Sequence, residues 1–187
     1  MKERTMTYRQ VLREFADERY GLVTTQDAIE LGVPAVELRK LAARGALTHL
    51  ARGLYRMPDI RPSQYDQFAE AVQRVGDGAY LTGDAVLALH NLALVNPRRI
   101  RVGTATRIRH ELPPYVEIIR RQIPKEDLTE YEGIRSTTVA QALLDCRGLV
   151  MRERLLEALR EATKKGLVTR SEAASTRAAL RNDKVSP

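Results

Sequence analysis

Residues 20–58 read YGLVTTQDAIELGVPAVELRKLAARGALTHLARGLYRMP, and this stretch decides the fold that we expect. It contains two short helical patterns, the first ended by Gly32 and the second opened by Pro34 and ended by Gly45. The apolar period then changes toward two, and Arg52-Gly53 marks a hairpin turn. Two short helices followed by a hairpin are the order of a winged helix-turn-helix.

Apolar residues in the same stretch predict which sides of these elements are buried. Thr24 or Thr25 can cap the first helix, and Asp27 lies in its first turn, where a negative charge suits the helix dipole. The expected apolar positions are Ala28, Ile29 and Leu31 in the first helix, Val36, Leu38, Leu41 and Ala42 in the second, and Leu47, Leu50, Leu54 and Tyr55 in the hairpin. A preceding helix over residues 6–19 would pack beneath them.

The charge of the second helix and the hairpin points to a nucleic acid. Residues 40–56 contain Lys40, Arg44, Arg52 and Arg56 but no acidic residue, and Arg39 stands just before them. The second helix of a helix-turn-helix lies in the major groove, and a wing can reach the backbone or the minor groove. We therefore predict DNA contacts from Arg39, Lys40, Arg44, Arg52 and Arg56, with Gly53 and Tyr55 shaping the wing. The alternative is a solvated basic surface, and the coincidence of charge with these two elements favours DNA.

Composition bounds the class of protein. The chain has 187 residues, 43% of them hydrophobic, a net charge of +7 and a pI of about 9.8, which favours a polyanionic partner. With a single cysteine, the chain can form no intrachain disulfide and no cysteine-rich zinc site. We find no hydrophobic signal region and no long apolar span, so we expect a cytoplasmic protein that contacts no membrane.

The remainder of the chain predicts a second domain of mixed helix and strand. Residues 58–63 contain two prolines and read as a link, so we expect domains over residues 1–60 and 61–187. Strands are expected over residues 99–104 and 115–120, a short strand or turn at 134–136, and helices over 64–75, 85–92, 139–144, 151–165 and 169–181. The predicted fold class is α+β and helix-rich.

A second basic stretch lies in this domain, at Arg99, Arg101, Arg107 and Arg109, and no acidic residue occurs between Ala85 and His110. If Arg99 and Arg101 share a strand, alternation places them on the same face, as a row suited to phosphate. Two other interpretations stay open: an exposed strand kept soluble by charge, or a surface for an acidic partner protein such as a toxin.

Residues that could carry catalysis do not form a recognised pattern. The chain has no Gly-x-Ser-x-Gly, no glycine-rich phosphate loop and no histidine pair at metal-ligand spacing. His90 and Cys146 lie in apolar helical segments and are expected to be buried. The carboxylates Asp84, Glu117 and Asp145 are scattered. We therefore predict a protein that is not an enzyme and that uses no cofactor and no metal.

The ordered set of residues in the first domain resembles the winged helix-turn-helix of the AbiEi-type antitoxins of type IV toxin–antitoxin modules. The matching positions are Gly21, Val23, Thr24, Gly32, Leu38, Leu41, Gly45, Leu47 and the run Arg52-Gly53-Leu54-Tyr55. The second domain resembles the same family at Tyr80–Leu92, Gly133–Thr137 and Ala142–Asp145. Some relatives continue into a nuclease-like domain after the last of these segments, whereas helices are expected there in this chain.

The resemblance implies a DNA-binding repressor of its own operon, with operator DNA as one partner and a nucleotidyltransferase-like toxin as the other. It also implies a C-terminal domain linked to antitoxin action and to further DNA contact. A homodimer on an inverted-repeat operator would match two-fold symmetry. Two alternatives remain: a winged module that docks proteins without binding DNA, and a nucleic-acid enzyme whose carboxylates gather around a lysine.

Overall fold

The computed structural model describes residues 6–182, and its contacts divide the chain into two compact units, Met1–Arg74 and Val75–Pro187. Both units combine helices with a sheet, so the fold is α+β, as predicted. The contact division falls at the end of helix α4 (Asp66–Val75). Contacts group most of α4 with the first unit. The domain boundary expected between residues 60 and 61 stays a prediction.

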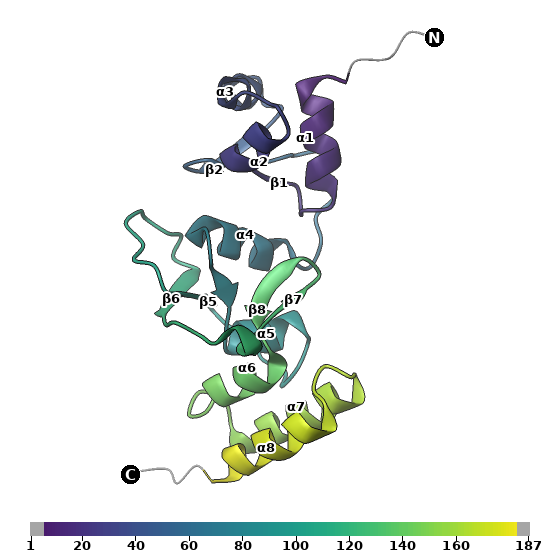
Figure 1. The fold of residues 1–187 in the computed structure, drawn as a ribbon, viewed down its shortest axis with the longest axis vertical. Helices are drawn as coiled ribbons and strands as arrows, with labels where there is room; N and C mark the ends of the chain where they lie inside the picture. The colour runs from purple at the N-terminus through teal and green to yellow at the C-terminus, as the bar shows by residue number, and fades with distance from the viewer. Residues whose placement is uncertain (1–5, 183–187) are drawn as a thin grey trace. The chain divides into compact units, whose positions relative to one another are not determined.

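The first unit has the element order of a winged helix-turn-helix (Figure 1). Before α4 it contains α1 (Tyr8–Asp17), β1 (Leu22–Thr24), α2 (Thr25–Glu30), α3 (Ala35–Ala43), β2 (Thr48–Ala51) and β3 (Leu54–Arg56). Its three strands form an antiparallel sheet in the order β1-β3-β2. The predicted turn at Arg52-Gly53 joins β2 to β3 and makes the wing.

Local polar contacts explain where the first helices begin. Thr24 caps α2: its hydroxyl accepts from the backbone N–H of Asp27, and the Asp27 carboxylate accepts from the Thr24 N–H at 2.8 Å. The Thr25 N–H donates to the Gly53 carbonyl at 2.8 Å and so ties the start of α2 to the wing turn. Thr7 and Gln10 form an equivalent capping box on α1.

The core of the first unit gathers one side of α1, α2 and α3 against the sheet. Its buried members are Leu12, Ala16, Val23, Ala28, Val33, Leu38, Leu47, Tyr55 and Met57. Two apolar positions expected in this core lie elsewhere: Ile29 and Val36 are 54% and 44% exposed. Both predictions were wrong because helices this short bury a narrow arc, and these two side chains fall outside it.

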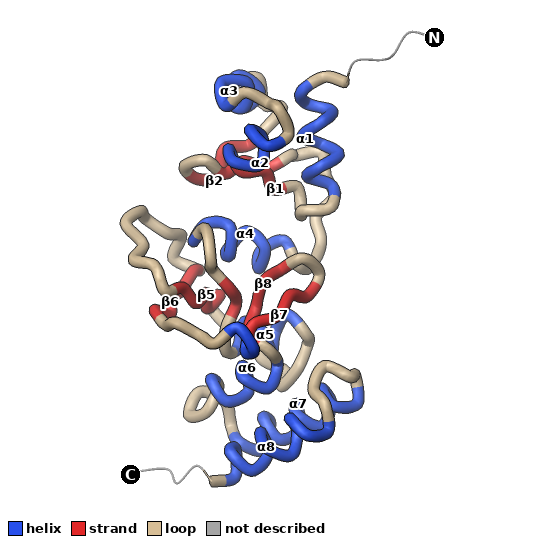
Figure 2. The backbone as a smooth tube through the Cα atoms, in the orientation of Figure 1, coloured by secondary structure: helices blue, strands red, loops and turns tan. Residues whose placement is uncertain are grey.

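The second unit is built on a five-stranded mixed sheet, drawn red in Figure 2. The strand order is β6-β5-β4-β8-β7, with β4 (Tyr80–Leu81), β5 (Ile100–Thr104), β6 (Val116–Arg120), β7 (Leu128–Tyr131) and β8 (Ile134–Thr137). β5 runs parallel to β6 and β4 runs parallel to β8, whereas the pairs β4–β5 and β7–β8 are antiparallel. A short 3-10 helix, η1 (Lys125–Asp127), precedes β7.

Four helices complete the second unit: α5 (Asp84–Leu89), α6 (Val139–Asp145), α7 (Arg152–Lys164) and α8 (Arg170–Arg181). α5 packs against β5 and α6, and α6 packs against α7 and α8. Figure 1 shows α7 and α8 side by side. Within residues 6–182, no helix combines the length and the apolar character needed to cross a bilayer.

Candidate nucleic-acid interface

Helix α3 presents a narrow exposed face that carries most of its charge. Successive residues turn by about 100°, so the side that buries Leu38 lies opposite the side that carries Val36. Arg39, Lys40 and Ala43 lie on the same exposed side as Val36. The second helix of the helix-turn-helix therefore offers solvent a strip of two cations and two small apolar side chains.

The cations on and beside this strip are accessible to a phosphate or a base. Arg39 and Arg44 make no ion pair with any residue that the structure describes, and both are exposed. Lys40 Nζ lies 2.7 Å from Glu37 Oε1 in an exposed pair three residues apart. Such surface pairs contribute about 0–1 kcal/mol, so a phosphate can replace Glu37 at little cost.

The wing places one arginine at its tip. Arg52 is exposed in the turn, and Gly53 follows with a φ of +73°, a conformation that a side chain would strain. Tyr55 lies inside the core, 7% exposed, and its ring centroid is 5.2 Å from that of His49. Tyr55 thus anchors the wing in the core, while Arg52 is exposed to solvent.

Arg56 differs from the other basic residues of the first unit, because carboxylates of α4 hold it. Its Nη2 lies 3.2 Å from Glu70 Oε2 and 4.0 Å from Asp66 Oδ2, as ion pairs without hydrogen-bond alignment. Glu70 also pairs with Arg74 at 2.6 Å, and Arg74 Nη1 donates to the Leu50 carbonyl at 2.9 Å. Arg56 is therefore part of a network that fastens α4 to the wing sheet.

The structure also holds Arg101 between two carboxylates. Its Nη1 lies 3.2 Å from Asp84 Oδ1, and its Nε lies 3.4 Å from Glu117 Oε2, directly across the β5–β6 pair. Burial raises the pKa of Asp84, and Arg101 opposes that shift. Arg99 and Arg101 therefore do not form the expected exposed row. Asp84 and Glu117, which lie before and after the stretch without acidic residues, both pair with Arg101.

The other three arginines of the second basic stretch are exposed. Arg99 precedes β5, and Arg107 and Arg109 lie in the loop between β5 and β6. None of the three forms an ion pair with residues 6–182. Of the nine basic residues that the sequence proposes for DNA, seven are thus exposed or lightly paired, and two belong to internal ion-pair networks.

A polar network absent from the sequence interpretation surrounds Asp145 at the end of α6. Its carboxylate accepts two bonds from the Arg121 guanidinium at 2.7 and 2.8 Å, one from the Thr82 hydroxyl at 2.9 Å and one from Gln141 at 2.8 Å. Burial disfavours its charge, but these bonds outweigh burial and hold the pKa of Asp145 below its usual range. The scattered carboxylates thus pair with arginines, which suits structural roles.

His90 and Cys146 are buried, as predicted. Burial, with a smaller contribution from Lys165, lowers the pKa of His90 to about 4, and the His90 ring lies 4.2 Å from that of Tyr131. Burial raises the pKa of the Cys146 thiol to about 12, so almost no thiolate exists at neutral pH. At neutral pH His90 is therefore uncharged and Cys146 is a thiol.

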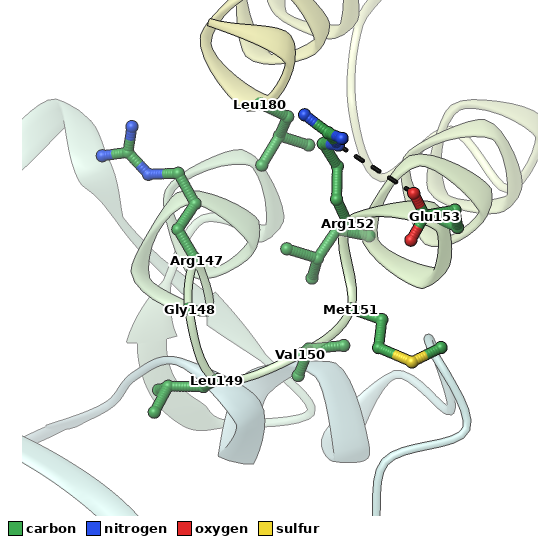
Figure 3. A pocket seen from close by; sticks show the side chains of 9 residues that line it. Arg147, Gly148, Leu149, Val150, Met151, Arg152, Glu153 and Leu180 are labelled. Atoms are coloured by element: carbon green, nitrogen blue, oxygen red, sulfur yellow. Dashed lines mark ion pairs between the residues drawn. The ribbon is translucent and has the colours of Figure 1, made fainter. Parts of the chain in front are cut away.

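A pocket of about 390 Å³ lies in the second unit, where α6 ends and α7 begins (Figure 3). Its lining is mostly apolar and comes from Leu149, Val150, Met151, Leu155 and Leu180, with Gly148, Arg147, Arg152 and Glu153 completing it. Leu149 and Met151 are also 58% and 64% exposed. The charged part of the lining consists of two arginines and one glutamate.

Comparison with known proteins finds a similarity in the first unit. Residues 10–58 match the family model described as "Transcriptional regulator, AbiEi antitoxin". The matched residues run from α1 to the end of the wing and include every predicted DNA contact of the first unit. No curated protein matches the chain. Residues 10–58 are thus similar to the AbiEi antitoxin transcriptional regulators, and the resemblance of the second unit to the same family stays a prediction.

Proposed function

We propose that this chain is a sequence-specific repressor that binds double-stranded DNA, and that it is the antitoxin of a type IV module whose operon it autoregulates. The observation that carries the proposal is the exposed basic face of α3, together with the exposed Arg52 of the wing turn, in a domain that matches the AbiEi antitoxin model. These two elements are the ones that a winged domain presents to DNA.

In this proposal α3 enters the major groove. Arg39 can donate two hydrogen bonds to one guanine, while Lys40 and Arg44 neutralise phosphates and fix the register of the helix. Arg52 reaches the adjacent backbone or minor groove. Arg99, Arg107 and Arg109 are proposed as further phosphate contacts. For Arg56 and Arg101 we propose a role in the fold, which their ion pairs with Glu70 and Asp84 support.

The remaining partners follow from the resemblance. A homodimer would place two α3 helices on an inverted repeat. A nucleotidyltransferase-like toxin, linked genetically or by direct contact, would be the second partner. The proposed activity consists of binding alone and requires neither a cofactor nor a metal.

The test is fluorescence anisotropy with a labelled duplex taken from upstream of the gene. Replacing Arg39, Lys40 and Arg44 together by alanine should weaken binding at least tenfold, because one bidentate base contact alone contributes about 1–3 kcal/mol. The control replaces three exposed arginines of α7 and α8, Arg154, Arg170 and Arg181, and should bind like the unaltered protein. Equal affinity of both folded variants would contradict the proposal that α3 reads DNA.

A further inference from the structure

Val36 is an apolar residue in an unexpected position. Single exposed apolar side chains are ordinary on protein surfaces and need no explanation by themselves. Val36, however, is 44% exposed at the second position of α3, on the helix that we propose enters the groove. Its position relative to the basic residues gives it a specific meaning.

The helix geometry places Val36 in the middle of the exposed strip. At about 100° per residue, Arg39 lies about 60° to one side of Val36, Lys40 about 40° to the other, and Ala43 about 20° away, one turn further along. Leu38 is about 160° away and fully buried. A groove that receives Arg39 and Lys40 must therefore also receive Val36.

The position along the axis favours contact with base edges. Residues near the start of a recognition helix contact the bases, and Val36 and Arg39 are the second and fifth of the nine residues of α3 (Ala35–Ala43). Three residues advance about 4.5 Å along a helix, and base pairs are spaced about 3.4 Å apart. The two side chains can thus face positions one or two base pairs apart.

The chemistry of the major groove then limits what each side chain can meet. The 5-methyl group of thymine is the apolar group that base edges expose there, and the valine methyl groups can contact it without leaving a polar group unpaired. The guanidinium of Arg39 matches the O6 and N7 acceptors of guanine. A cytosine amino group facing Val36 would lose its hydrogen bond to water, which disfavours that base.

We propose that Val36 and Arg39 form a specificity pair, in which Val36 reads a thymine methyl group and Arg39 reads a guanine one or two base pairs away. The assignment rests on the proposed DNA-binding function and deepens it by naming the bases. It adds Val36 to the residues that determine the operator sequence, a residue that charge alone would not have selected.

The experiment begins with full-length protein and a pool of duplexes with a randomised central region. Selected duplexes should contain a thymine within two base pairs of a guanine. Each such thymine is then replaced by deoxyuridine, which removes only the 5-methyl group. We expect about a fourfold loss of affinity at one thymine of each half-site, the effect of one buried methyl group.

Two variants assign that loss to a residue. Val36→Ala should bind thymine and deoxyuridine duplexes equally, and it should fold, because alanine is the stronger helix former. Ile29→Ala removes a similarly exposed apolar side chain from α2 and should keep the fourfold difference. A fourfold difference that persists in Val36→Ala, or no difference at any selected thymine, would overturn the assignment of Val36.

These outcomes are distinguishable from failure of the proposed function. Selection of a defined sequence without a deoxyuridine effect would leave a DNA-binding repressor that reads its site without Val36. Failure to enrich any sequence, together with weak salt dependence, would overturn DNA reading and this inference with it. A specificity pair predicts both an enriched sequence and a methyl effect that depends on Val36.

Discussion

Arg52 and Arg56 show at the scale of single residues how position decides what a charge can do. They are four residues apart on the same wing, and nothing in the local sequence separates their roles. Arg52 lies in an exposed turn, whereas Glu70 of α4 lies 3.2 Å from Arg56. A guanidinium already paired at a partly buried site contributes to stability first, because moving it to a phosphate would take from the Glu70 carboxylate one of its two arginine partners.

His90 provides a residue-scale prediction about pH. Because the pKa of His90 is about 4 in the folded chain and about 6.5 in the unfolded chain, only the unfolded chain gains this proton between those values. Stability attributable to His90 is therefore complete above pH 6.5 and falls as the pH drops toward 4. Between pH 7.5 and 5.0 this loss should be about 1–2 kcal/mol after allowance for solvent screening.

The measurement is urea unfolding of the unaltered protein and of His90→Gln at both pH values. At pH 7.5 the difference between them reports the loss of packing against Tyr131. The glutamine cannot titrate, so at pH 5.0 the difference should shrink as the unaltered protein loses stability. A difference that is the same at both pH values would contradict a buried neutral His90.

How far the sequence predicted these residues depended on the distance of their partners. The Arg52-Gly53 turn and the Thr24 cap were predictable, because turns and caps are set by residues within a few positions. The bonds from Arg121 and Thr82 to Asp145 span 24 and 63 residues, and no spacing signals them. The position of Val36 on the opposite side of the helix from Leu38 indicated that it is exposed, but its hydrophobicity led to the prediction that it is buried.

The elements themselves were predicted unevenly, for a physical reason. The longer helices α1, α7 and α8 carry several turns of apolar period and were placed within a few residues. β1, β4 and β7 contain two to four residues and were not predicted, because a strand this short is too brief to reveal an alternating apolar pattern. β1 pairs with β3, and β4 pairs with β8, so a partner of each of these two short strands lies far away in the sequence.

The ion-pair network between α4 and the wing sheet includes Arg56 but not Arg52, so the roles of these two arginines can be separated. Arg56→Ala should lower the free energy of unfolding by about 1–3 kcal/mol, because Glu70 and Arg74 are 12% and 15% exposed and lose part of their network. Arg52→Ala should leave the unfolding free energy within about 0.5 kcal/mol and weaken DNA binding instead.

Urea unfolding and anisotropy on the same preparations would check this division. The control is a double-mutant cycle: Arg56→Ala combined with Glu70→Gln should cost less than the sum of the two single changes, because both single changes remove the same ion pair. If Arg52→Ala destabilised the protein and Arg56→Ala weakened only binding, the ion-pair network would not be the reason that Arg56 is present.

At the scale of the whole molecule, exposed cations occur in both units, and it can be tested which of them contact DNA. Arg39, Lys40, Arg44 and Arg52 belong to the first unit, and Arg99, Arg107 and Arg109 to the second. The net charge of +7 favours a polyanion in general and does not say which cations meet it. Salt dependence can count them, because each neutralised phosphate releases counterions.

The last prediction concerns Arg99, Arg107 and Arg109 in the full-length protein. If all three lie on DNA, replacing them by glutamine should reduce the slope of log affinity against log salt by about 3, since each phosphate contact contributes about 0.9. The control replaces Arg154, Arg170 and Arg181 by glutamine, which lowers the net charge equally and should leave the slope unchanged. A reduced slope in both variants would indicate an effect of overall charge. Unchanged slopes in both would make the winged unit the sole contact with DNA and leave these three arginines for solvent or an acidic protein partner.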